Sequence, residues 1–499
     1  MFRKVLIANR GEIAVRITKT LQEMGIQAVA IYSDIDEDSL HVEYSDEAYS
    51  LYGSTSKDTY LNIEKIIDIA KVAKVDAIHP GYGFLSENPR FAQACLDANI
   101  VFIGPSPSVI AEMGDKILAK KAMTKASVPV VPGWSGNISD IDEIKNVANK
   151  IGYPVLVKAA AGGGGKGMRI VKEVAELEQS IESAGREAQN AFGDNRVFIE
   201  KYIMNPRHIE FQIFGDTHGN VIHLFERECS IQRRHQKIIE ESPSSALTPE
   251  LRKKMGEAAV MAGKAIGYTN AGTVEFILDE NKNFYFLEVN TRLQVEHPVT
   301  ESIIHGDLVK AQILVAMGEK LSITQNDVIQ DGHAIECRIY AEDPQNNFFP
   351  STGILEVYKE PTGPGIRVDS GVKQGSVISV HYDPMLAKLI TYSKTRNAAI
   401  EKMLWALNHY PVLGITTNIS FLHDVINHSV FRSGDIDTHF LEKYNVFDSA
   451  RINKDKELAI ALSGLICDGN KNIASLVVDN KQQKSNLEPW LNIGNWRMI

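Results

Sequence analysis

The sequence predicts a protein of the α/β and α+β classes, with a Rossmann-like segment at the N-terminus and a β-rich segment at the C-terminus. The chain has 499 residues, too many for one ordinary hydrophobic core, so two to four domains are expected. Strand and helix patterns alternate from Met1 to about Gly114, which favours a parallel sheet. Short strand patterns predominate from His333 onwards.

The N-terminal segment, residues 1–114, is predicted as the Rossmann-like domain. Ile13, Ile17 and Leu21 recur at helical spacing within Gly11–Met24, and Gly25 follows as a helix stop. The second expected helix is Tyr60–Ala73, and the expected strands are Lys4–Asn9, Ala28–Tyr32, Asp76–His79 and Ile100–Ile103. The first turn, Ala8–Glu12, lacks the GxGxxG spacing, which argues against an NAD-dependent oxidoreductase.

Residues 115–319 are predicted to form a second domain with a small lid at about residues 131–203. The lid begins near the proline-marked segment Val128–Gly133 and has the order strand, glycine loop, strand, helix, strand. The remaining strand patterns are Arg207–Phe214, Val221–Glu226, Ala271–Asp279 and Phe284–Asn290, and the helical patterns are Pro249–Ile266 and Val299–Met317.

Residues 333–447 are predicted to form a third, β-rich domain that ends in helices. Its strand patterns are Ala334–Tyr340, Leu355–Lys359, Gly365–Ser370 and Met385–Tyr392, and its helical patterns are Ala398–Leu407 and Asn418–Asn427. The tail, residues 448–499, is more polar and is interpreted as an appendage whose role the sequence does not define.

Composition and charge argue against several classes of protein. The formal net charge is −10 without a basic run, which disfavours nucleic-acid binding through phosphate contacts. The apolar runs are too short for a membrane span or a signal peptide, so we expect a cytoplasmic protein. The widely separated cysteines fit a reducing compartment rather than a zinc site or a disulfide framework; they are Cys95, Cys229, Cys337 and Cys467.

A glycine-rich loop at Ala161–Met168 is the first candidate for chemistry. Glycines let backbone amides approach an anion, and this loop follows the apolar strand Tyr153–Lys158. It is not a Walker loop, because Gly167 follows Lys166 where Ser or Thr is needed. A hairpin lid with Lys158 at its base suits the phosphates of ATP, whereas a flexible linker with an exposed lysine is the alternative.

Polar and apolar residues alternate strictly through Phe284–Pro298, which predicts an extended chain with one polar face. Pro298 disfavours helical backbone at residue 297, so the extension is expected to reach that point. A solvated edge strand is the alternative, although the apolar flanking sequence favours a buried strand with a function. The residues of the polar face are Glu288, Asn290, Arg292, Gln294 and Glu296.

Two further groups of residues suit ATP chemistry. Glu275 stands alone among apolar neighbours, and with Glu288 and Asn290 it provides hard oxygen ligands for Mg²⁺ or Mn²⁺. The segment Gln232–Lys237 carries basic groups that suit phosphate or bicarbonate. Taken alone, this segment is better explained as an exposed charged loop.

Six separated motifs resemble those of biotin carboxylases across about residues 1–447. They are Asn9–Ala14, Asp76–Asn88, the glycine loop, Gln232–Lys237, Glu288–Glu296 and Glu336–Glu342. The resemblance implies an ATP-grasp domain with a mobile glycine-rich lid, placed between a Rossmann-like N-domain and a β-rich C-terminal domain. It also implies ATP- and bicarbonate-dependent carboxylation of biotin on a separate carrier protein, through carboxyphosphate.

The resemblance assigns roles to individual residues. ATP would be held by Lys116, Lys158, Gly164, Gly165, His208, Gln232, His235, Glu275 and Glu288, with the adenine beside Glu200, Lys201, Tyr202 and Ile203. Two Mg²⁺ or Mn²⁺ ions would be bound by Glu275, Glu288 and Asn290. Bicarbonate would be bound by Lys237, Arg292, Gln294 and the amide of Val295. Glu296 would be the general base, Arg338 would stabilise the biotin enolate, and Tyr82 would lie beside the biotin ring; the catalytic set would be Glu296, Arg292, Arg338 and Lys237.

The chain contains no tetrapeptide Ala-Met-Lys-Met or Val-Met-Lys-Met of the kind that carries biotin. We therefore expect a separate biotin carboxyl carrier protein and a carboxyltransferase subunit, in a homodimer or a larger carboxylase complex. The final acceptor stays open between acetyl-CoA, propionyl-CoA and pyruvate. The tail resembles the extension of acyl-CoA carboxylase and two-subunit pyruvate carboxylase chains.

Two other functions compete with this prediction. Another ATP-grasp ligase, which makes carbamoyl phosphate or acts in purine synthesis, would not be expected to combine His79–Asn88 with Lys237, Arg292, Glu296 and Arg338. A catalytically idle scaffold would not need every catalytic position to be filled.

Overall fold

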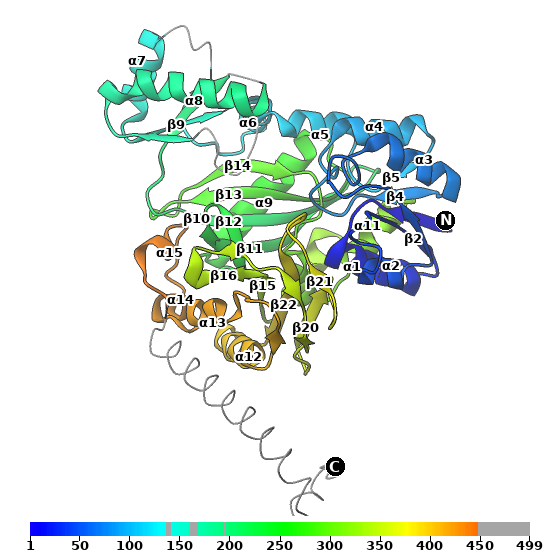
Figure 1. Cartoon of the computed structure of the whole chain (residues 1–499). Coiled ribbons are helices and arrows are strands. Elements are labelled where there is room, and N and C mark those ends of the chain that lie inside the picture. Colours follow the sequence, from blue (N-terminus) through cyan, green and yellow to red (C-terminus); the bar gives the residue numbers. More distant parts are fainter. Residues whose placement is uncertain (136–140, 160–167, 194–195, 448–499) are drawn as a thin grey trace, which may run out of the picture. The chain divides into compact units, whose positions relative to one another are not determined.

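The computed structural model of the chain describes residues 1–135, 141–159, 168–193 and 196–447 (Figure 1). Residues Met1–Val446 form one structural unit, and Phe447–Ile499 form a second one that is described only at Phe447. The predicted appendage, the glycines Gly164 and Gly165, and Cys467 lie outside the described residues. Within the described part of the chain, no helix is long and apolar enough to cross a membrane.

The N-terminal segment folds around a five-stranded parallel sheet of order β3-β2-β1-β4-β5, as the alternating pattern predicts. Its strands are β1 (Lys4–Ile7), β2 (Gln27–Tyr32), β3 (Glu47–Ser50), β4 (Ala77–His79) and β5 (Val101–Phe102). Its helices are α1 (Gly11–Glu23), α2 (Leu40–Tyr44), α3 (Ile63–Ala73), α4 (Pro89–Asp97) and α5 (Pro107–Gly114). Helix α3 begins later than the expected Tyr60, because the Asn62 side chain accepts a hydrogen bond from the Lys65 amide and caps it.

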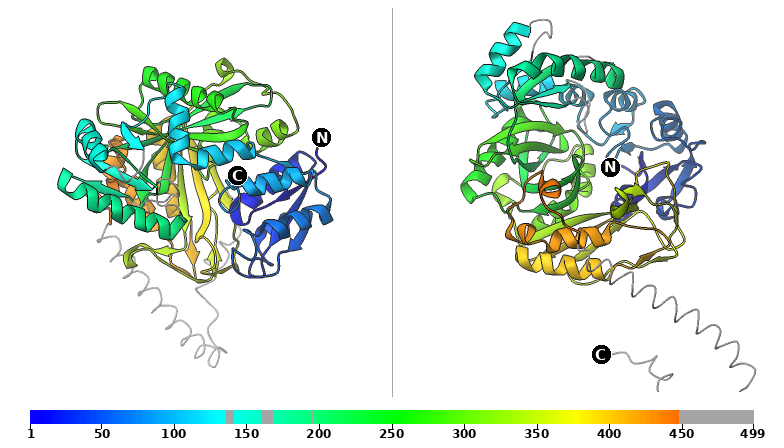
Figure 2. Two further views of the ribbon diagram at one scale, coloured as in Figure 1. Left: turned by 90° about the horizontal axis from the view of Figure 1, so that it is seen from above. Right: turned by 60° about the vertical axis from the view of Figure 1, so that its left-hand side comes forward.

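A lid segment follows, with its own four-stranded antiparallel sheet of order β6-β9-β7-β8. The strands are β6 (Gly133–Ser135), β7 (Val155–Ala159), β8 (Arg169–Val171) and β9 (Val197–Lys201), and the helices are α7 (Ile141–Ile151), η1 (Val174–Glu176) and α8 (Leu177–Phe192). Helix α6 (Lys116–Lys125) precedes the lid, and its buried residues Ala119 and Met123 belong to the core of the central sheet. Val155 and Val157 pack against Ile144 and Ile181 in a separate small core. Figure 1 shows this segment next to β14 (Phe284–Asn290), and the right-hand view of Figure 2 shows it at one end of the Met1–Val446 unit.

An eight-stranded antiparallel sheet of order β14-β13-β10-β11-β12-β15-β22-β20 forms the centre of the unit. Its other strands are β10 (Arg207–Gly215), β11 (Val221–Arg233), β12 (Gln236–Ser242), β13 (Asn270–Leu278), β15 (His333–Tyr340), β20 (Ile366–Ser370) and β22 (Met385–Ser393). Pairing of β12 with β15 joins the central segment to the C-terminal one, with Ile239 opposite Cys337. The same sheet therefore contains strands from the central segment, residues 115–319, and from the C-terminal segment, residues 333–447.

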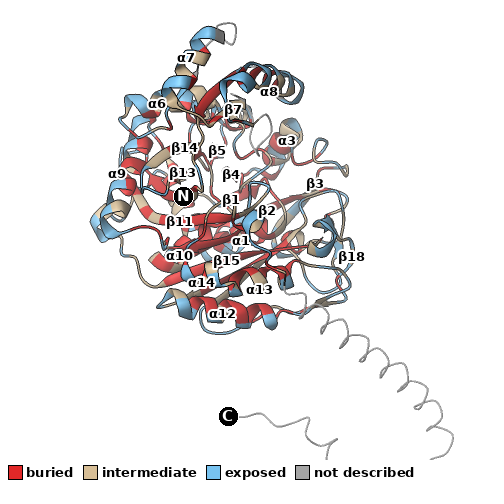
Figure 3. Cartoon of the chain, turned by 90° about the vertical axis from the view of Figure 1, so that its left-hand side faces the viewer, coloured by how far each residue is buried: buried red, intermediate tan, exposed pale blue. Residues whose placement is uncertain are grey.

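The remaining elements surround this sheet. The helices are α9 (Pro249–Ala265), α10 (His297–Ile304), α11 (Leu308–Ala316), η2 (Gln325–Asp327), η3 (Pro344–Asn346), α12 (Arg396–Asn408), α13 (Ile419–Asn427), α14 (Ser429–Ser433) and α15 (Phe440–Lys443). Short strands complete the C-terminal segment: β16 (Glu342–Asp343), β17 (Phe349–Pro350), β18 (Gly353–Ile354), β19 (Val357–Tyr358), β21 (Val377–Ile378) and β23 (Val412–Leu413). Figure 3 shows that buried residues concentrate in the sheet strands and in the helix faces turned toward them.

The expectation that the chain stays extended from Phe284 to residue 297 is wrong. Strand β14 ends at Asn290, and Glu296 has φ −80° and ψ 11° as the residue that precedes helix α10. Pro298 lies in the first turn of that helix, where a missing backbone N–H costs nothing because that N–H has no partner within the helix. The polar residues beyond Asn290 therefore lie on a turn rather than on a strand face.

Two other expected elements also differ. The helix expected over Val299–Met317 is broken at His305, which has φ 52°, and Asp307 caps the next helix by accepting a hydrogen bond from the Lys310 amide. The segment Gln232–Lys237 is a tight hairpin that joins β11 to β12, not an open loop. Its turn residues Arg234 and His235 both have positive φ, at 49° and 65°.

Phe211 tests the core between helix α9 and the sheet. Its side chain is 0% exposed and meets the Phe276 ring edge-on at 6.2 Å. We expect Phe211→Ala to lower the free energy of unfolding by about 3–5 kcal/mol, measured by denaturant titration. The control Phe349→Ala removes a ring that is 60% exposed and should cost less than about 0.5 kcal/mol. Equal losses in the two variants would contradict this packing.

Candidate active site

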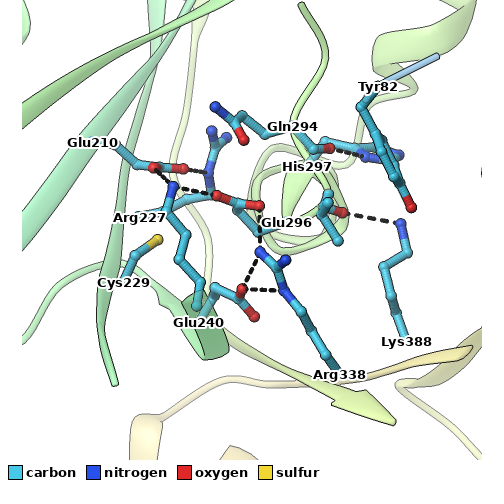
Figure 4. Close-up of polar contacts among 12 residues, drawn as sticks. Tyr82, Glu210, Arg227, Cys229, Glu240, Gln294, Glu296, His297, Arg338 and Lys388 are labelled. Atoms are coloured by element: carbon cyan, nitrogen blue, oxygen red, sulfur yellow. Dashed lines mark hydrogen bonds and ion pairs between the residues drawn. The ribbon is translucent and has the colours of Figure 1, made fainter. Parts of the chain in front are cut away.

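The candidate site lies on one face of the eight-stranded sheet, where alternate residues of neighbouring strands are polar and buried (Figure 4). Side chains two apart on a strand point to the same side. On β10 this places His208, Glu210 and Gln212 together, and the paired strand β13 brings Glu275 opposite Glu210. Buried charges are costly unless they are paired, so the site is organised by its ion pairs.

Lys237 on β12 lies between three carboxylates from three different elements. Its ammonium contacts Glu210, lies 2.9 Å from Glu275 Oε1 and lies 2.6 Å from Glu296 Oε1. Burial by itself lowers the pKa of Lys237, but the three carboxylates outweigh it and raise that pKa well above its ordinary value. Lys237 therefore stays positively charged.

Glu296 is fully buried between two cations, Lys237 and Arg338. Its second oxygen accepts a hydrogen bond of 2.9 Å from Arg338 Nη2. Burial raises the pKa of Glu296, yet Lys237, Arg338 and Arg227 together hold it well below its ordinary value. The carboxylate is therefore ionised and able to accept a proton.

Arg338 on β15 is shared between Glu296 and a second carboxylate, Glu240. Its Nε donates to Glu240 Oε1 at 2.6 Å. Burial is the main cause that raises the pKa of Glu240 to about 7, against the opposing charge of Arg338. The guanidinium is thus held in place by two acidic groups of different strength.

The residues predicted to bind metal meet at the other side of Lys237. Glu288 lies opposite Glu275 in the β13–β14 ladder, and Asn290 Nδ2 donates to Glu275 Oε1 at 2.8 Å. Burial and the charge of Glu275 raise the pKa of Glu288. A divalent cation would offset this repulsion, so the two carboxylates and the amide oxygen fit Mg²⁺ or Mn²⁺.

His208 also belongs to this part of the site. Its Nε2 lies 3.1 Å from Glu275 Oε2, and its Nδ1 lies 2.9 Å from Gln232 Nε2. Burial lowers the pKa of His208, but Glu275 outweighs it, so that the pKa is raised overall. His235, by contrast, is exposed at the hairpin turn.

The turn after β14 carries the residues predicted to bind bicarbonate. Arg292 Nε donates to Glu87 Oε2 at 2.8 Å, and Arg292 Nη1 donates to Gln294 Oε1 at 3.1 Å. The Gln294 amide nitrogen is buried and has no hydrogen-bond partner among the described residues. The Val295 carbonyl accepts a hydrogen bond of 3.0 Å from Lys388 Nζ. Glu87 and Lys388 thus hold the turn at its two ends, and the side-chain amide of Gln294 remains available as a buried hydrogen-bond donor.

The residues predicted to surround ATP in the lid form a second ion-pair cluster around Glu200 on β9. Its two oxygens lie 2.9 Å from Lys120 Nζ and 2.7 Å from Lys158 Nζ. Burial raises the pKa of Glu200, but the two lysines lower it overall. Lys158 therefore has a carboxylate partner at the base of the lid, as well as a position next to the predicted glycine loop.

The other predicted adenine and phosphate residues lie nearby. Lys201 Nζ donates to the Gly152 carbonyl at 2.9 Å, and Tyr202 Oη lies 3.3 Å from His439 Nε2. Ile203 follows them and is partly exposed. Lys116 begins helix α6, and its charge lowers the pKa of Glu288. Lys116 is therefore within electrostatic reach of the metal-binding carboxylates.

Tyr82, predicted to contact biotin, lies in the loop after β4. Its hydroxyl donates a hydrogen bond to Glu12 of helix α1, and its ring centroid lies 5.9 Å from Lys388 Nζ. Figure 4 shows Tyr82 and Lys388 on the side of Glu296 away from Glu210.

The sequence prediction missed several members of the site. Glu210 and Arg227 form a fully buried pair at 2.6 Å, and Arg227 also donates to Gln212 Oε1 at 2.7 Å. One carboxylate oxygen of Glu210, one of Glu296 and the Sγ atom of Cys229 lie within 4.8 Å of one another. A signal was present for Glu210, because His208, Glu210 and Gln212 alternate with apolar residues in β10. No comparable signal identifies Glu12, Glu240 or Lys388.

Three family descriptions match successive parts of the chain. "Biotin carboxylase, N-terminal domain" matches residues 1–110, "Carbamoyl-phosphate synthase L chain, ATP binding domain" matches residues 115–324, and "Biotin carboxylase C-terminal domain" matches residues 336–443. Together they cover all three segments of the described unit.

Characterised relatives match over most of the chain. Biotin carboxylase 1 of Bacillus subtilis is 53% identical over 450 residues, which are 90% of this chain and 100% of that protein. A pyruvate carboxylase subunit of Methanothermobacter thermautotrophicus is 52% identical, with 91% of this chain and 92% of that protein covered. The mitochondrial methylcrotonoyl-CoA carboxylase alpha chain of Rattus norvegicus is 51% identical over 89% of this chain, which spans only 62% of that longer protein.

Solved structures agree with these relatives. The biotin carboxylase domain dimer of Hydrogenobacter thermophilus 2-oxoglutarate carboxylase, in complex with MgADP, ADP and bicarbonate, has a TM-score of 0.86 and 50% identity. The match covers 90% of this chain and 99% of that one. Biotin carboxylase from Campylobacter jejuni, in a β,γ-ATP complex, also gives a TM-score of 0.86, with 46% identity over 89% of this chain and 99% of that one.

Because Lys237 pairs with three buried carboxylates, we expect its replacement to lower the stability of the protein strongly. Lys237→Met leaves three carboxylates without their shared ammonium and should lower the free energy of unfolding by about 3–5 kcal/mol at pH 7. The loss should shrink near pH 5, because without Lys237 burial raises the pKa of Glu275 and Glu296, so that the variant takes up protons on these groups as the pH falls. Lys253→Met is the control, since its pair with Glu257 is exposed and should contribute less than about 1 kcal/mol. Equal losses in chemical denaturation would contradict the central position of Lys237.

Proposed function

The chain belongs to the biotin carboxylase family, and we propose that it uses ATP and bicarbonate to carboxylate biotin on a separate carrier protein. This is the first half-reaction of biotin-dependent carboxylases. The arrangement of Glu296 is the observation that supports the proposal most strongly: a buried, ionised carboxylate touches both Lys237 and Arg338. The proposed reaction needs a base for bicarbonate, a cation for bicarbonate and a cation for biotin. In this proposal Glu296, Lys237 and Arg338 fill these three roles.

The first step joins bicarbonate to the γ-phosphate of ATP. An oxygen of bicarbonate forms a bond to phosphorus while the bond to ADP breaks, and Glu296 removes the bicarbonate proton. General-base help of this kind contributes about 10²–10⁴ in rate. Two negative groups must meet in this step, so Lys237 and Arg292 offset their repulsion. Mg²⁺ or Mn²⁺, held by Glu275, Glu288 and Asn290, would supply further positive charge at the phosphate oxygens.

The low pKa of Glu296 makes it a weak base before substrate enters. We infer that bicarbonate draws part of the positive charge of Lys237 to itself and so raises the basicity of Glu296. After Glu296 accepts the proton, its charge is lost, and of the two carboxylates that pair with Arg338 among the described residues Glu240 remains. The guanidinium is then available to a developing negative charge. Proton transfer in the first step thus prepares Arg338 for the second.

The second step carboxylates biotin. Carboxyphosphate breaks its bridging C–O bond to give CO₂ and phosphate, and phosphate removes the N1′ proton of the biotin ureido group. Arg338 stabilises the enolate that forms, Tyr82 lies beside the ring, and N1′ attacks CO₂. Gln294 and the amide of Val295 hold bicarbonate at the start of the reaction; the unpartnered amide nitrogen of Gln294 supports that role.

The nucleotide would lie between the lid and the sheet. Lys116, Lys158, Gly164 and Gly165 would hold the phosphates, and Glu200–Ile203 would hold the adenine. His208, Gln232, Glu275 and Glu288 would complete the site from the sheet, together with His235 at the turn of the β11–β12 hairpin.

As partners we propose a biotin carboxyl carrier protein and a carboxyltransferase subunit, with the chain itself a homodimer within a larger carboxylase. The named dimer of the Hydrogenobacter thermophilus domain and the pyruvate carboxylase relative support this assembly. The cytoplasm is the proposed compartment.

An ADP-release assay tests the function as a whole. With Mg²⁺ and ATP, release should require bicarbonate and should rise when free biotin is added. Turnover that is indifferent to biotin would favour another carboxyphosphate-forming ligase, an alternative suggested by the central match to a carbamoyl-phosphate synthase domain. No turnover, even with a carrier protein present, would favour a scaffold.

Glu296→Ala tests the general base. Bicarbonate-dependent ADP release should fall by about 10²–10⁴, whereas the Kd for ATP should change less than about twofold, because Glu296 is not among the nucleotide contacts. Glu226→Ala is a matched control, since it removes another fully buried carboxylate that pairs with Arg252 outside the site. Full turnover of Glu296→Ala would exclude Glu296 as the base.

Arg338→Ala tests the enolate cation. Biotin carboxylation should fall by about 10²–10³, more than bicarbonate-dependent ADP release measured without biotin, because the enolate forms only in the second step. Arg396→Ala, which breaks a buried pair with Glu241 elsewhere on the sheet, is the control for lost stability. Equal losses of both activities in Arg338→Ala would indicate a structural arginine.

A further inference from the structure

Lys388 on β22 is a buried lysine that the steps above do not use. Its side chain is 0% exposed, and it reaches the site from the C-terminal segment (Figure 4). We propose that Lys388 and Glu12 form a positioning pair that couples the bicarbonate-binding turn to the Tyr82 wall of the biotin site. This inference rests on the proposed function and extends it to two further residues.

The first contact of Lys388 holds the turn. Its ammonium donates a hydrogen bond of 3.0 Å to the Val295 carbonyl, in the turn between Arg292 and the base Glu296. The Gln294 carbonyl of the same turn accepts a hydrogen bond of 3.3 Å from the His297 amide and lies 2.8 Å from His297 Nδ1. A charged donor on a backbone carbonyl fixes the peptide plane, and the plane fixes the direction in which the neighbouring amides point. Lys388 thereby sets the geometry of the turn without touching substrate.

The second contact reaches the biotin side. Lys388 Nζ lies 3.2 Å from Glu12 Oε2, and the other oxygen of Glu12 accepts a hydrogen bond from the Tyr82 hydroxyl. The Tyr82 ring centroid is 5.9 Å from the same ammonium, which adds a cation–π contact. Tyr82 is therefore held at its hydroxyl and over its ring by the same pair. A shift of Lys388 would move the turn and the ring together.

The third contact anchors the lysine from the sheet. Asp369 on the neighbouring strand β20 lies 3.7 Å from Lys388 Nζ and is itself bound by Arg367 at 2.8 Å. Burial lowers the pKa of Lys388, but Glu12, Asp369 and Glu336 raise it overall. The lysine therefore stays charged, and its hydrogen bond to the Val295 carbonyl does not depend on its own titration.

Glu12 gives the pair a pH dependence that packing alone would not. Burial is the main cause that raises the pKa of Glu12 to about 7, against the charge of Lys388. The groups that face it are Lys388, Asp369, Arg367 and Tyr82. Above pH 7 the carboxylate binds both Lys388 and the Tyr82 hydroxyl. Below pH 7 protonation weakens the ion pair, so the hold on Tyr82 loosens as the pH falls.

Steady-state kinetics of Lys388→Met in the full-length chain tests the coupling. We expect the KM values for bicarbonate and for free biotin to rise about tenfold each, and the KM for ATP to change less than about twofold. Arg252→Met is the matched control, because it breaks the pair with buried Glu226 outside the site and should lower Tm with all three KM values unchanged. Unchanged KM values in Lys388→Met, or equal rises in all three, would overturn the proposal and leave Lys388 a structural lysine.

Glu12→Gln separates the two sides and keeps the shape of the side chain. It should raise the KM for biotin and leave the KM for bicarbonate within about twofold, because the contact of Lys388 with Val295 survives. We expect the biotin KM of the unaltered protein to rise between pH 8 and pH 6, and this rise should disappear in the variant. A biotin KM that is unchanged by Glu12→Gln, or one that keeps its full pH dependence, would refute the role of Glu12.

The result that would refute the proposed function differs from the result that would refute the positioning pair. If the unaltered protein released no ADP in response to bicarbonate, the activity itself would be refuted before any variant was compared. If it did so and both variants kept unaltered KM values, the activity would stand and the positioning pair would be wrong.

Discussion

The ammonium of Lys237 inside a ring of three carboxylates is the contact on which the rest of the site depends. Glu210, Glu275 and Glu296 come from β10, β13 and the turn after β14, and buried carboxylates this close to one another are costly unless a cation is paired with them. Arg227 and Arg338 add charge on either side. The eight-stranded sheet brings the three carboxylates, which are far apart in the sequence, into contact with Lys237.

The same charge balance links stability to chemistry. Glu296 is shared by Lys237 and Arg338, so a proton that arrives on Glu296 changes the partners of both cations at once. Glu240, whose pKa is about 7, supplies the remaining anchor for Arg338. Lys388 performs an analogous task for the turn, since one buried cation contacts the Val295 carbonyl and Glu12. A site of this kind can couple its steps through shared partners.

Local sequence patterns predicted much of the fold, and tertiary contacts explain what they missed. The strand patterns predicted from the sequence placed His208 on β10, Glu275 on β13, and Glu288 and Asn290 on β14, as the structure has them, and the alternating N-terminal segment is a parallel sheet. The chain beyond Asn290 turns because Glu87 binds Arg292 and Lys388 binds the Val295 carbonyl, and both partners are far away in sequence.

Other features left no local signal. The hairpin at Arg234 and His235 has two positive φ angles without the glycine or asparagine that usually marks such a turn. Pairing of β12 with β15 joins strands about one hundred residues apart, which periodicity does not reveal. Most of the other residues of the site were identified either by the resemblance to biotin carboxylases or by their contacts in the structure. Lys388 had neither a motif nor a pattern to mark it.

The most direct test of the mechanism follows an oxygen atom. If bicarbonate attacks the γ-phosphate with Glu296 as its base, ATP turnover with ¹⁸O-labelled bicarbonate should place one ¹⁸O in each phosphate released, as measured by mass spectrometry. Phosphate that takes its oxygen from ¹⁸O-labelled water instead would mean that water, not bicarbonate, is the nucleophile, and would contradict the roles of Lys237, Arg292 and Glu296 in the first step.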